Sequence, residues 1–519
     1  MATNRLLRLD AAFIFFCGLI LFTAGLSHQE IIGFESRFYL FALEMGRHGL
    51  AWFPTTYQEP YPDYPGTSTA LIYLTAKLFG TLNKWVAVLP SAIAAALTLS
   101  ATYLIGAIQS RKGGWYAVGF LLFTLAFITE ARTISLDMYV AAATTWIFYL
   151  ISSAKYQERT PPWGWMVLLL VASFAIRGPV GIVIPAGVAS IFYLLEKDWR
   201  SWVIFSMLSF LLLIACTGIL LAIAHHVGGD AFMQNVFHME IAGRMEVNRT
   251  PPHYFYFKES IGAYAITYPL AILILAGSVS RFFKKNPTQS IRFLRSLAGW
   301  ILVIMLGLSI PADKKVRYIL SISPALALVC SYLIVTILNG FLHWTKKGFY
   351  WLCRLLPLLA LGVLYVLYQK QVVLPYYFLT AFFIVIQMMM VIIRNNDTVF
   401  FLAVATFFSA NVFIVEKINV DSNKTRDFVR QVEVIREKNH AKLAFYHEGR
   451  DGIAIKYLLN MSNEESPQFV SDISKTQVKS VFFVTSKENY YVLPESVRKN
   501  LHVMMAGRIG RDEVVVFSK

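Results

Sequence analysis

Charge, cysteine and the motifs of soluble enzymes are all scarce in this sequence. Only 15% of its 519 residues are charged, whereas 56% are hydrophobic and the mean hydropathy is +0.54. A soluble chain of this length carries more polar residues, so the composition predicts a protein whose main solvent is the lipid bilayer. The four cysteines lie in apolar stretches without CxxC spacing, which indicates neither a disulfide framework nor a zinc site.

The charge that is present is mostly basic, but it is not arranged for nucleic acid. Lys and Arg number 47 against 31 Asp and Glu, which gives a formal net charge of +16. These residues lie in short loops between apolar runs, without a basic helix or an aromatic-interleaved patch. We therefore expect membrane lipids, and no nucleic acid, as partners. Arg5 and Arg8 before an apolar run resemble a secretory signal, yet the repeated apolar runs downstream favour an uncut first helix.

Apolar runs long enough to cross a bilayer recur along most of the chain. A crossing helix needs about 20 apolar residues, and somewhat fewer where the protein thins the path. The sequence predicts about thirteen spans, near residues 9–26, 84–109, 114–130, 134–153, 163–176, 179–195, 201–225, 262–280, 293–310, 318–338, 349–368, 373–393 and 398–416. The piece from Thr67 to Gly80 is too short and is interrupted by Lys77, so we expect an interfacial helix there.

The loops between these spans indicate the orientation, because Lys and Arg are retained on the cytoplasmic side. With the N-terminus inside, the basic positions 111–112, 155–159, 281–295, 346–347 and 394 all fall inside. The outer face then receives loops 27–83 and 226–261, the turn 311–317 and everything after Glu416. These outer segments hold the unusual polar residues.

The last hundred residues differ in character from the rest. Strands are predicted at 442–446, 478–484 and 513–517, and helices at 425–438 and 452–459. We expect residues 1–416 to form an all-α polytopic transmembrane domain and residues 417–519 a soluble α/β domain on the periplasmic side. No Gly-rich phosphate loop, GxSxG or HExxH occurs in the latter, which favours a modulatory or acceptor-docking role over catalysis.

Several acids and arginines lie on the predicted outer face. Charged side chains at membrane depth are costly, so they are usually paired with one another or have a function. Glu35 and Arg37 in the first loop are candidates for a reaction, and an ordinary solvated pair is the alternative. Asp137 begins an apolar helix, so a helix cap or dipole partner is an equal alternative.

The outer loop 226–261 combines histidines with an aromatic run, a pattern that suits a lipid-linked anionic substrate. An interfacial amphipathic helix with an aromatic belt explains it equally well. His238 and Glu240 are considered as metal ligands, but no spacing requires a metal. We expect no metal and no cofactor, with a divalent ion as the open alternative.

Several outer pieces together are similar to the motifs of one family. They are Glu35-Ser36-Arg37-Phe38, similar to Asp-Glu-x-Arg-Tyr; Glu44-Met45 followed by Gly49 and Pro54; Tyr61 to Pro65, similar to Tyr-x-Glu-Lys-Pro; Leu136-Asp137; Arg177-Gly178-Pro179, near Lys-Gly-Pro; and Lys315 to Leu320 with Pro324, near Lys-x-x-x-Tyr-x-Leu and a following Pro. Along essentially the whole membrane part, the chain resembles the polyprenyl-phosphate-sugar glycosyltransferases of the GT-C class. The resemblance is to the bacterial lipid A aminoarabinose transferases and the related protein O-mannosyltransferases. Two departures matter: Phe34 replaces the family's Asp and Tyr64 replaces its Lys.

The resemblance implies transfer of a sugar from a polyprenyl-phosphate carrier at the outer side of a bacterial inner membrane. A base takes the proton of an acceptor hydroxyl, and cations stabilise the departing phosphate. Glu35 is the first candidate for the base, with Asp63 and Asp137 as alternatives or orienting partners. The implied ligands of the lipid phosphate are Arg37, Arg177, Lys315, Arg317 and Tyr318.

The implied partners are an undecaprenyl-phosphate-linked sugar and an acceptor, which is lipid A, another envelope glycolipid or glycan, or a protein. An acceptor that is itself a phosphate needs no strong base, which makes Phe34 easier to accommodate. An inert relative acting as a membrane scaffold is one alternative, because Phe34 stands in place of an acid. A lipid or sugar transporter is another, although the matching halves typical of transporters are not found. The Trp-Trp-Asp-x-Gly element of oligosaccharyltransferases is not found either.

Overall fold

The computed structural model describes residues 2–27, 29–57, 59–62, 65–245, 251–336, 340–370, 377–421, 424–461, 467–473 and 481–518. The chain divides into two compact units. The first, called here the membrane unit, comprises residues 1–26, 62–68 and 88–416. The second, called here the α/β unit, comprises residues 27–61, 69–87 and 417–519.

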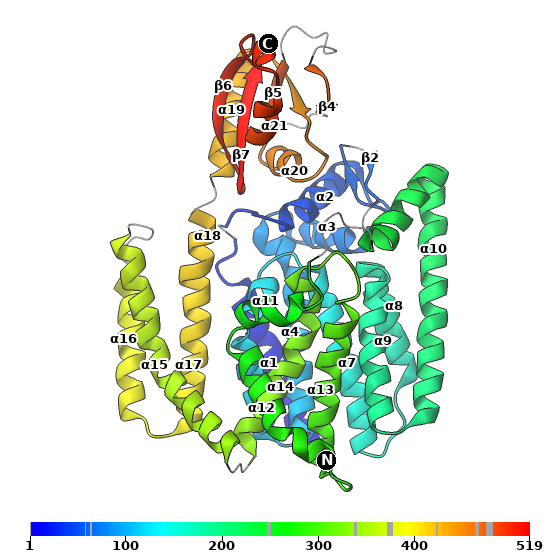
Figure 1. The fold of residues 1–519 in the computed structure, drawn as a ribbon, viewed down its shortest axis with the longest axis vertical. Helices are drawn as coiled ribbons and strands as arrows, with labels where there is room; N and C mark the ends of the chain where they lie inside the picture. The colour runs from blue at the N-terminus through cyan, green and yellow to red at the C-terminus, as the bar shows by residue number, and fades with distance from the viewer. Residues whose placement is uncertain are drawn as a thin grey trace. The chain divides into compact units, whose positions relative to one another are not determined.

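Helices that run side by side build the membrane unit (Figure 1). They are α1 (Ala2–Thr23), α4 (Lys84–Ala107), α5 (Arg111–Leu122), α6 (Leu125–Ala131), α7 (Leu136–Tyr156), α8 (Trp163–Arg177), α9 (Val180–Leu195), α10 (Trp199–Glu240), η1 (Ala242–Arg244), α11 (Phe255–Ala263), α12 (Thr267–Phe282), α13 (Gln289–Gly307), η2 (Val316–Ile322), α14 (Ser323–Val335), α15 (Phe341–Gln369), α16 (Tyr377–Ile392), α17 (Asn396–Ala410) and η3 (Asn411–Glu416).

In the part of the chain that the structure describes, every expected apolar span overlaps one of these helices or two consecutive ones. Among the described residues, seven helices are long and apolar enough to cross a membrane, and nine if the bent pairs α5–α6 and α11–α12 each count as one span. Three further apolar helices, α8, α9 and α16, are shorter. The chain is therefore a multi-span membrane protein, while the number thirteen stays a prediction.

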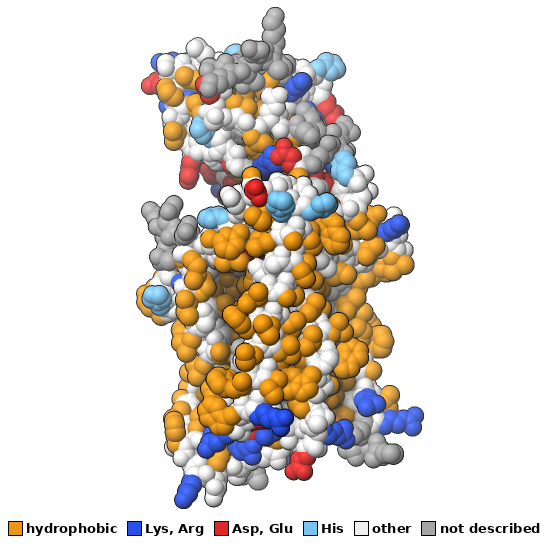
Figure 2. All heavy atoms as spheres, turned by 90° about the vertical axis from the view of Figure 1, so that its right-hand side faces the viewer, with side chains coloured by type: hydrophobic (Ala, Val, Ile, Leu, Met, Phe, Trp, Pro, Cys, Tyr) orange, Lys and Arg blue, Asp and Glu red, His pale blue; other side chains and the backbone are white. Residues whose placement is uncertain are grey.

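The surface of the membrane unit matches a lipid environment. On the face drawn in Figure 2, hydrophobic side chains form a continuous band and Lys and Arg gather at one end of it. On α10, Met207, Phe210 and Ile214 follow one another at helical spacing and are each more than half exposed. Helix α10 also differs from expectation, because it bends at Gly228 and Gly229 and continues to Glu240, so residues 226–240 are helical rather than loop.

Helices α8 and α9 form a tight hairpin because two glycines lie at their junction. Gly178 ends α8 with φ +64, a left-handed conformation that favours glycine. A β-carbon on Gly181 would lie 2.3 Å from the carbonyl oxygen of Ser173. The short connection places the end of α8, and therefore Arg177, beside the start of α9.

Arg132 ties three helices of the membrane unit together. Its buried guanidinium donates to the carbonyl oxygens of Leu21 and Ala24 near the end of α1, and pairs with Glu416 at 3.0 Å. Glu416 is the last residue of η3, a π-helical turn. A charge so deeply buried is retained only because these partners replace its water.

The α/β unit combines a five-stranded sheet with short helices. Its elements are α2 (Glu35–His48), β1 (Thr55–Thr56), β2 (Glu59–Pro60), α3 (Thr67–Phe79), α18 (Lys417–Asp421), α19 (Thr425–Lys438), β3 (Lys442–Tyr446), α20 (Ile453–Leu458), β4 (Gln468–Val470), β5 (Val481–Ser486), α21 (Lys487–Val492), α22 (Glu495–Arg498), β6 (His502–Ile509) and β7 (Asp512–Ser518). The strand order is β4-β3-β5-β7-β6, with β3 parallel to β4 and β5 and the other pairs antiparallel.

Two apolar layers stabilise this sheet. Phe428 and Val432 of α19 and Tyr457 of α20 belong to one buried cluster, and Tyr490 of α21 belongs to another. The expected C-terminal α/β domain is confirmed, including the helix at 425–438, and α3 agrees with the helix expected from Thr67. Strands β4 and β6 and helix α2 were not expected.

Candidate functional site

A buried carboxylate lies between two arginines in the membrane unit. Asp137 is the second residue of α7, and its Oδ1 accepts a hydrogen bond from Nε of Arg177 at 2.9 Å. Nε of Arg317 lies 3.5 Å from the other carboxylate oxygen. The side chains of Asp137 and Arg177 are 9% and 2% exposed. Asp137 is therefore part of a buried ion pair, and its place in the first turn of α7 also agrees with the alternative of a helix-dipole partner.

The turn before α14 adds an aromatic ring and a second carboxylate to this group. The ring of Tyr318 lies 5.4 Å from the Arg177 guanidinium, 5.7 Å from that of Arg317 and 5.6 Å from the Lys315 ammonium. The Tyr318 hydroxyl donates to Asp313 at 2.9 Å, and Lys315 pairs with the same carboxylate at 3.3 Å. Rings this close to cations stabilise them through the quadrupole of the aromatic face.

We call these six residues the Asp137 cluster: Asp137, Arg177, Asp313, Lys315, Arg317 and Tyr318. It joins three cations to two carboxylates, so its members carry one positive charge in excess. The segments that supply them are α7, the end of α8 and the turn into η2, which are far apart in the sequence. Five of the six were expected as site residues. Asp313 was missed, although its place two residues before Lys315 was the available signal.

A third buried carboxylate approaches the end of α8. Glu240, the last residue of α10, is 3% exposed. Its Oε2 lies 2.9 Å from the point where a β-carbon on Gly178 would stand. Gly178, next to Arg177, thus leaves room for the Glu240 carboxylate. The sequence suggested Glu240 only as a metal ligand. Among the residues that the structure describes, no group of three or more His, Cys, Asp and Glu side chains could hold a metal ion.

Glu35, the first candidate for the base, lies in the α/β unit and begins α2. Its Oε1 lies 3.0 Å from the ammonium of Lys84 and accepts from the backbone N–H of Ile32 at 3.3 Å. The two side chains of the ion pair are 2% and 3% exposed. Glu35 is therefore not half of a solvated pair with Arg37, because residues two apart on a helix face different directions.

Arg37 has a partner that the sequence did not suggest. Its Nη2 lies 3.3 Å from Oδ2 of Asp451, the same oxygen that accepts from the Tyr61 hydroxyl at 2.5 Å. The Arg37 guanidinium also lies over the rings of Phe34 and Tyr61, at 5.3 and 5.6 Å. Phe34, which replaces the family's acid, thus supports the arginine through its ring.

The remaining pieces of the first loop have structural partners. Oε1 of Glu44 accepts from the backbone N–H of Tyr57 at 2.6 Å, and Gly49 ends α2 at φ 94. Burial raises the pKa of Tyr57 well above its usual range, and the charges of Glu44 and Asp451 raise it further. Asp63 and Tyr64 lie outside the described residues, so the expectations about them stay predictions.

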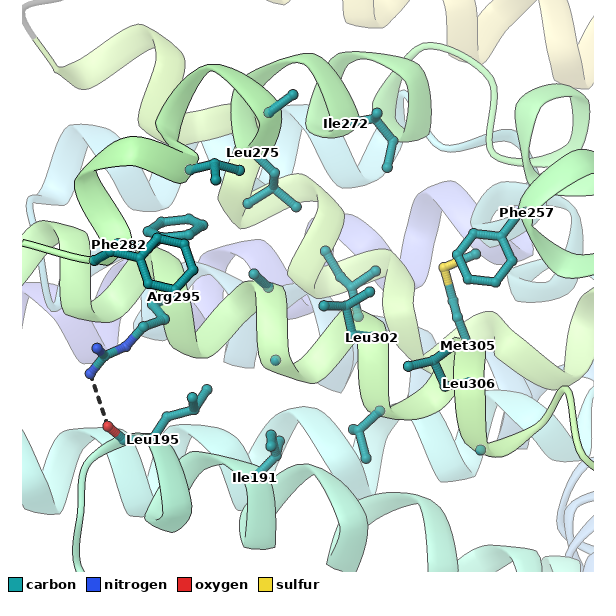
Figure 3. Close-up of a pocket in the computed structure, with 18 of the residues that line it drawn as sticks. Ile191, Leu195, Phe257, Ile272, Leu275, Phe282, Arg295, Leu302, Met305 and Leu306 are labelled. Carbon is teal, nitrogen blue, oxygen red and sulfur yellow. Dashed lines mark hydrogen bonds between the residues drawn. The ribbon is translucent and has the colours of Figure 1, made fainter. Parts of the chain in front are cut away.

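An apolar groove of about 970 Å³ runs along α13 in the membrane unit (Figure 3). Helices α9 and α12 form its sides, and Phe257 of α11 and Leu306 lie at the end opposite Arg295. Ile310, four residues after Leu306, also lines the groove. Arg295 is the one charged residue among its described lining, and its guanidinium donates to the carbonyl oxygen of Leu195 at 2.9 Å. A groove lined this way suits a hydrocarbon chain.

Comparison with known sequences finds a family model that matches part of the chain. Residues 63–226 match the model of the family described as dolichyl-phosphate-mannose-protein mannosyltransferase. An uncharacterized protein of Aquifex aeolicus (strain VF5) is 25% identical over 230 residues, which are 43% of this chain. That match spans 49%, or about half, of the length of the relative.

Comparison with solved structures extends over nearly the whole chain. ArnT from Cupriavidus metallidurans bound to undecaprenyl phosphate is similar with a TM-score of 0.71 and 16% identity, covering 97% of each chain. Its apo state gives a TM-score of 0.68 at 16% identity, covering 99% of this chain and 98% of that one. The Archaeoglobus fulgidus oligosaccharyltransferase with Zn and sulfate gives 0.50 at 10% identity, covering 92% and 68%.

These findings agree with the resemblance seen in the motifs of the outer segments. The family match covers part of the membrane unit, and the structural likeness to ArnT covers both units. The expected resemblance is therefore confirmed, and this chain is a multi-span membrane protein with the fold of the GT-C glycosyltransferases.

Proposed function

We propose that this chain is a membrane glycosyltransferase that moves a sugar from undecaprenyl phosphate, or a similar polyprenyl phosphate, to an envelope acceptor. The acceptor is lipid A, another glycolipid or glycan, or a protein. The Asp137 cluster carries the proposal, because it brings two guanidiniums together at the buried Asp137 carboxylate, with Lys315 in the same cluster, and paired cationic donors suit a lipid phosphate. The ArnT structure of the same fold that is bound to undecaprenyl phosphate supports this class of donor.

In the proposed reaction an acceptor oxygen bonds to the anomeric carbon as the bond from that carbon to the phosphate oxygen breaks. The electron pair leaves with the polyprenyl phosphate, so negative charge grows on the phosphate in the transition state. Arg177 and Arg317 then act as planar donors to that charge, and Lys315 acts as a point charge. Asp137 holds the two guanidiniums in place beforehand, which is the preorganisation that makes such donors effective.

The base depends on the acceptor. A hydroxyl acceptor must lose its proton, and Glu35 stays our first candidate, with Asp63 and Asp137 as alternatives. Glu35 is paired with Lys84 in the structure, so its action as a base requires substrate to weaken that pair. An acceptor phosphate is already anionic, and the reaction then needs only the cations.

The apolar groove along α13 supports a substrate with a long hydrocarbon chain. One end of the groove lies at Ile310, three residues before Asp313 of the cluster. We propose that the groove takes part of the donor or acceptor lipid while the cluster holds the phosphate. The basic loops favour an outer position for this end, so we propose that it lies on the outer side of a bacterial inner membrane, with the N-terminus cytoplasmic and residues 417–519 periplasmic in a modulatory or acceptor-docking role.

An inert scaffold is the second candidate, and Phe34 is the observation that favours it. This ring stands where the family has an acid, and it packs against Phe38 and under Arg37. An inert relative keeps the fold and binds lipid phosphate without forming a glycosidic bond.

Mass spectrometry of envelope lipids, glycans and proteins tests the proposal. Cells with the gene deleted, restored, or carrying Asp137→Asn or Glu35→Gln are compared, and Asp397→Asn serves as the matched control. Asp397 is also ion-paired near the start of a helix, with Lys112 at 2.7 Å on α5. We expect a sugar-sized mass to disappear on deletion, to return with wild type and the control, and not to return with Asp137→Asn.

Restoration by both acid variants would remove these acids from the mechanism. An unchanged envelope in the deletion strain would favour the inert reading, and accumulation of an intact lipid on one side of the membrane without any new glycosidic bond would favour transport.

A further inference from the structure

A second pocket of about 590 Å³ lies in the membrane unit, far from the Asp137 cluster. The end of α14, the first half of α15 and Asn396 at the start of α17 form its walls. Arg317 of the cluster and Val335 of the pocket lie near opposite ends of the 20-residue apolar stretch Val316–Val335. Twenty helical residues measure roughly 30 Å, which is about the thickness of the hydrocarbon core. The pocket is therefore at the other face of the membrane.

Basic side chains follow one face of α15 into this pocket. His343, Lys346, Lys347 and Arg354 line it, at spacings that bring them to the same side of the helix, and none of the described lining residues is acidic. Lys346 donates to the carbonyl oxygen of Ile334 at 2.6 Å. Because that partner is neutral, the bond fixes the side chain without cancelling its charge.

The other charged contacts around the pocket leave its positive charge in place. Arg354 donates to the carbonyl oxygens of Met390 and Ile393, which are again neutral partners. Asp397 follows Asn396, but Lys112 pairs with its carboxylate at 2.7 Å and the Tyr116 hydroxyl donates to it. That pair is neutral by itself, so the lysines and arginine of the lining stay uncompensated.

The start of α17 adds to this positive potential. Asn395 caps the helix by accepting from the backbone N–H of Asp397, and Asn396 is the first residue of a 15-residue helix. The N-terminal end of such a helix carries a partial positive charge and favours anions. The N-terminal end of α17 and the basic side chains of α15 therefore both make the electrostatic potential in the pocket positive.

Aromatic rings on α15 indicate the source of the anion. Phe341, Trp344 and Trp351 are 57%, 66% and 60% exposed, and the Lys347 ammonium lies 5.1 Å from the Trp344 ring. Exposed tryptophans beside lysines are typical of the level of the lipid head groups. Basic pockets between transmembrane helices on the cytoplasmic side bind the head groups of anionic lipids.

We infer that this pocket binds the phosphate head group of an anionic glycerophospholipid, whose acyl chains lie against the exposed face of α15. The ligand belongs to the leaflet opposite the proposed transfer reaction, so the site is separate from that of the sugar donor. Lys346, Lys347 and Arg354 hold the phosphate, and Trp351 marks the border between head group and chains.

Native mass spectrometry of the full chain, released from nanodiscs of phosphatidylcholine and phosphatidylglycerol, tests the inference. Wild type is expected to retain phosphatidylglycerol selectively, and Lys346→Gln/Lys347→Gln to lower that retention at least about tenfold. Lys347→Gln alone, which leaves the Lys346 bond to Ile334 intact, is expected to lower it less and guards against loss of folding. Lys284→Gln/Lys285→Gln is the matched control, because it removes two exposed charges from the loop after α12, outside the pocket.

Equal losses in the pocket variant and the control would overturn the inference, because charge attraction without a site would then explain the retention. Release of the lipid by millimolar inorganic phosphate or glycerol 3-phosphate would overturn the assignment to a lipid and point to a soluble anion. Retention of phosphatidylcholine equal to that of phosphatidylglycerol would overturn it as well.

Discussion

The two buried carboxylates expected to act in the reaction have different surroundings. Asp137 in the membrane unit is held by two arginines, within a cluster of three cations and two carboxylates. Glu35 in the α/β unit pairs with Lys84, and both members of that pair are almost completely buried.

The difference separates two uses of a buried charge. Two guanidiniums that share one carboxylate offer an arriving phosphate paired planar donors. A closed pair of one acid and one lysine is already neutral, so an incoming group must break it first, at the cost of an uncompensated buried charge. The geometry therefore favours the Asp137 cluster for the phosphate and gives the Glu35–Lys84 pair a structural task besides any catalytic one.

The largest effect is expected for Asp137→Asn. Removing the carboxylate leaves Arg177 and Arg317 without their shared partner, so both move from the positions proposed for the phosphate. We expect the initial rate of sugar transfer to fall about 10²- to 10³-fold, the size of losing one preorganised donor. The rate is measured in nanodiscs by mass spectrometry of the modified acceptor. A folded variant with an unchanged rate would remove Asp137 from the reaction.

A double-mutant cycle at Glu35 and Lys84 gives the next largest effect. Glu35→Gln leaves Lys84 buried without its counter-charge and is expected to lower the free energy of unfolding by about 3 kcal/mol. Glu35→Gln/Lys84→Met removes both charges and is expected to recover most of that loss. Thermal unfolding and transfer rates are measured for both variants. If the double variant regains stability but not activity, Glu35 is the base, whereas recovery of both makes the pair purely structural.

Asp451→Asn is expected to have a smaller effect. Its bonds to Arg37 and Tyr61 are partly exposed, so the loss of charge lowers stability by about 0.5–1 kcal/mol. If Arg37 binds the lipid phosphate as the motif implies, loss of the carboxylate that holds it in place also raises the KM for the donor by a few fold. Asp512→Asn is the control, because Asp512 pairs with Lys456 at 3.3 Å with similar exposure. Equal KM values in both variants would assign Arg37 to structure alone.

The smallest effect on stability is expected for Glu513. Like Asp137, its carboxylate lies between two cations, but at the surface of the protein. Its carboxylate accepts from Lys487 and Arg508, and these bonds lower its pKa. Because the pKa is lower in the folded state, the stabilisation is present at neutral pH and is lost as the pH falls through the folded pKa, in the range below about 4.5. Acid unfolding of Glu513→Gln should differ slightly from wild type, with no difference in 1 M salt. A salt-independent difference would contradict this explanation.

Hydropathy was sufficient to locate the membrane helices, because a span must be apolar along its whole length. Amphipathic and edge elements were not found. Helix α2 has buried Phe38, Phe41 and Met45 at helical spacing, but its mixed polar sequence looked like a loop. Strand β6 is an edge strand with mostly exposed side chains, and its Gly507 is required by the approach of Phe428, a contact that no local pattern reveals.

The candidate residues were predictable in kind, but their partners were not. Acids and arginines on the outer face are signals because charge is costly at membrane depth. Which arginine meets Asp137 depends on how α7 and α8 pack. Glu35 and Lys84 are 49 positions apart in the sequence, and Arg37 and Asp451 are 414 positions apart, so no local pattern reveals either pair. Lys84 is the first residue of an apolar helix, and this position was the one local indication that it has a buried acidic partner.

Gly178 shows how closely the cluster is packed against its neighbours. A side chain there meets two independent obstacles, the left-handed backbone and the Glu240 carboxylate. Shortening Glu240 would relieve only the second obstacle, and the backbone penalty of roughly 1–2 kcal/mol would remain. A change at position 240 alone is therefore not expected to make a side chain at position 178 acceptable.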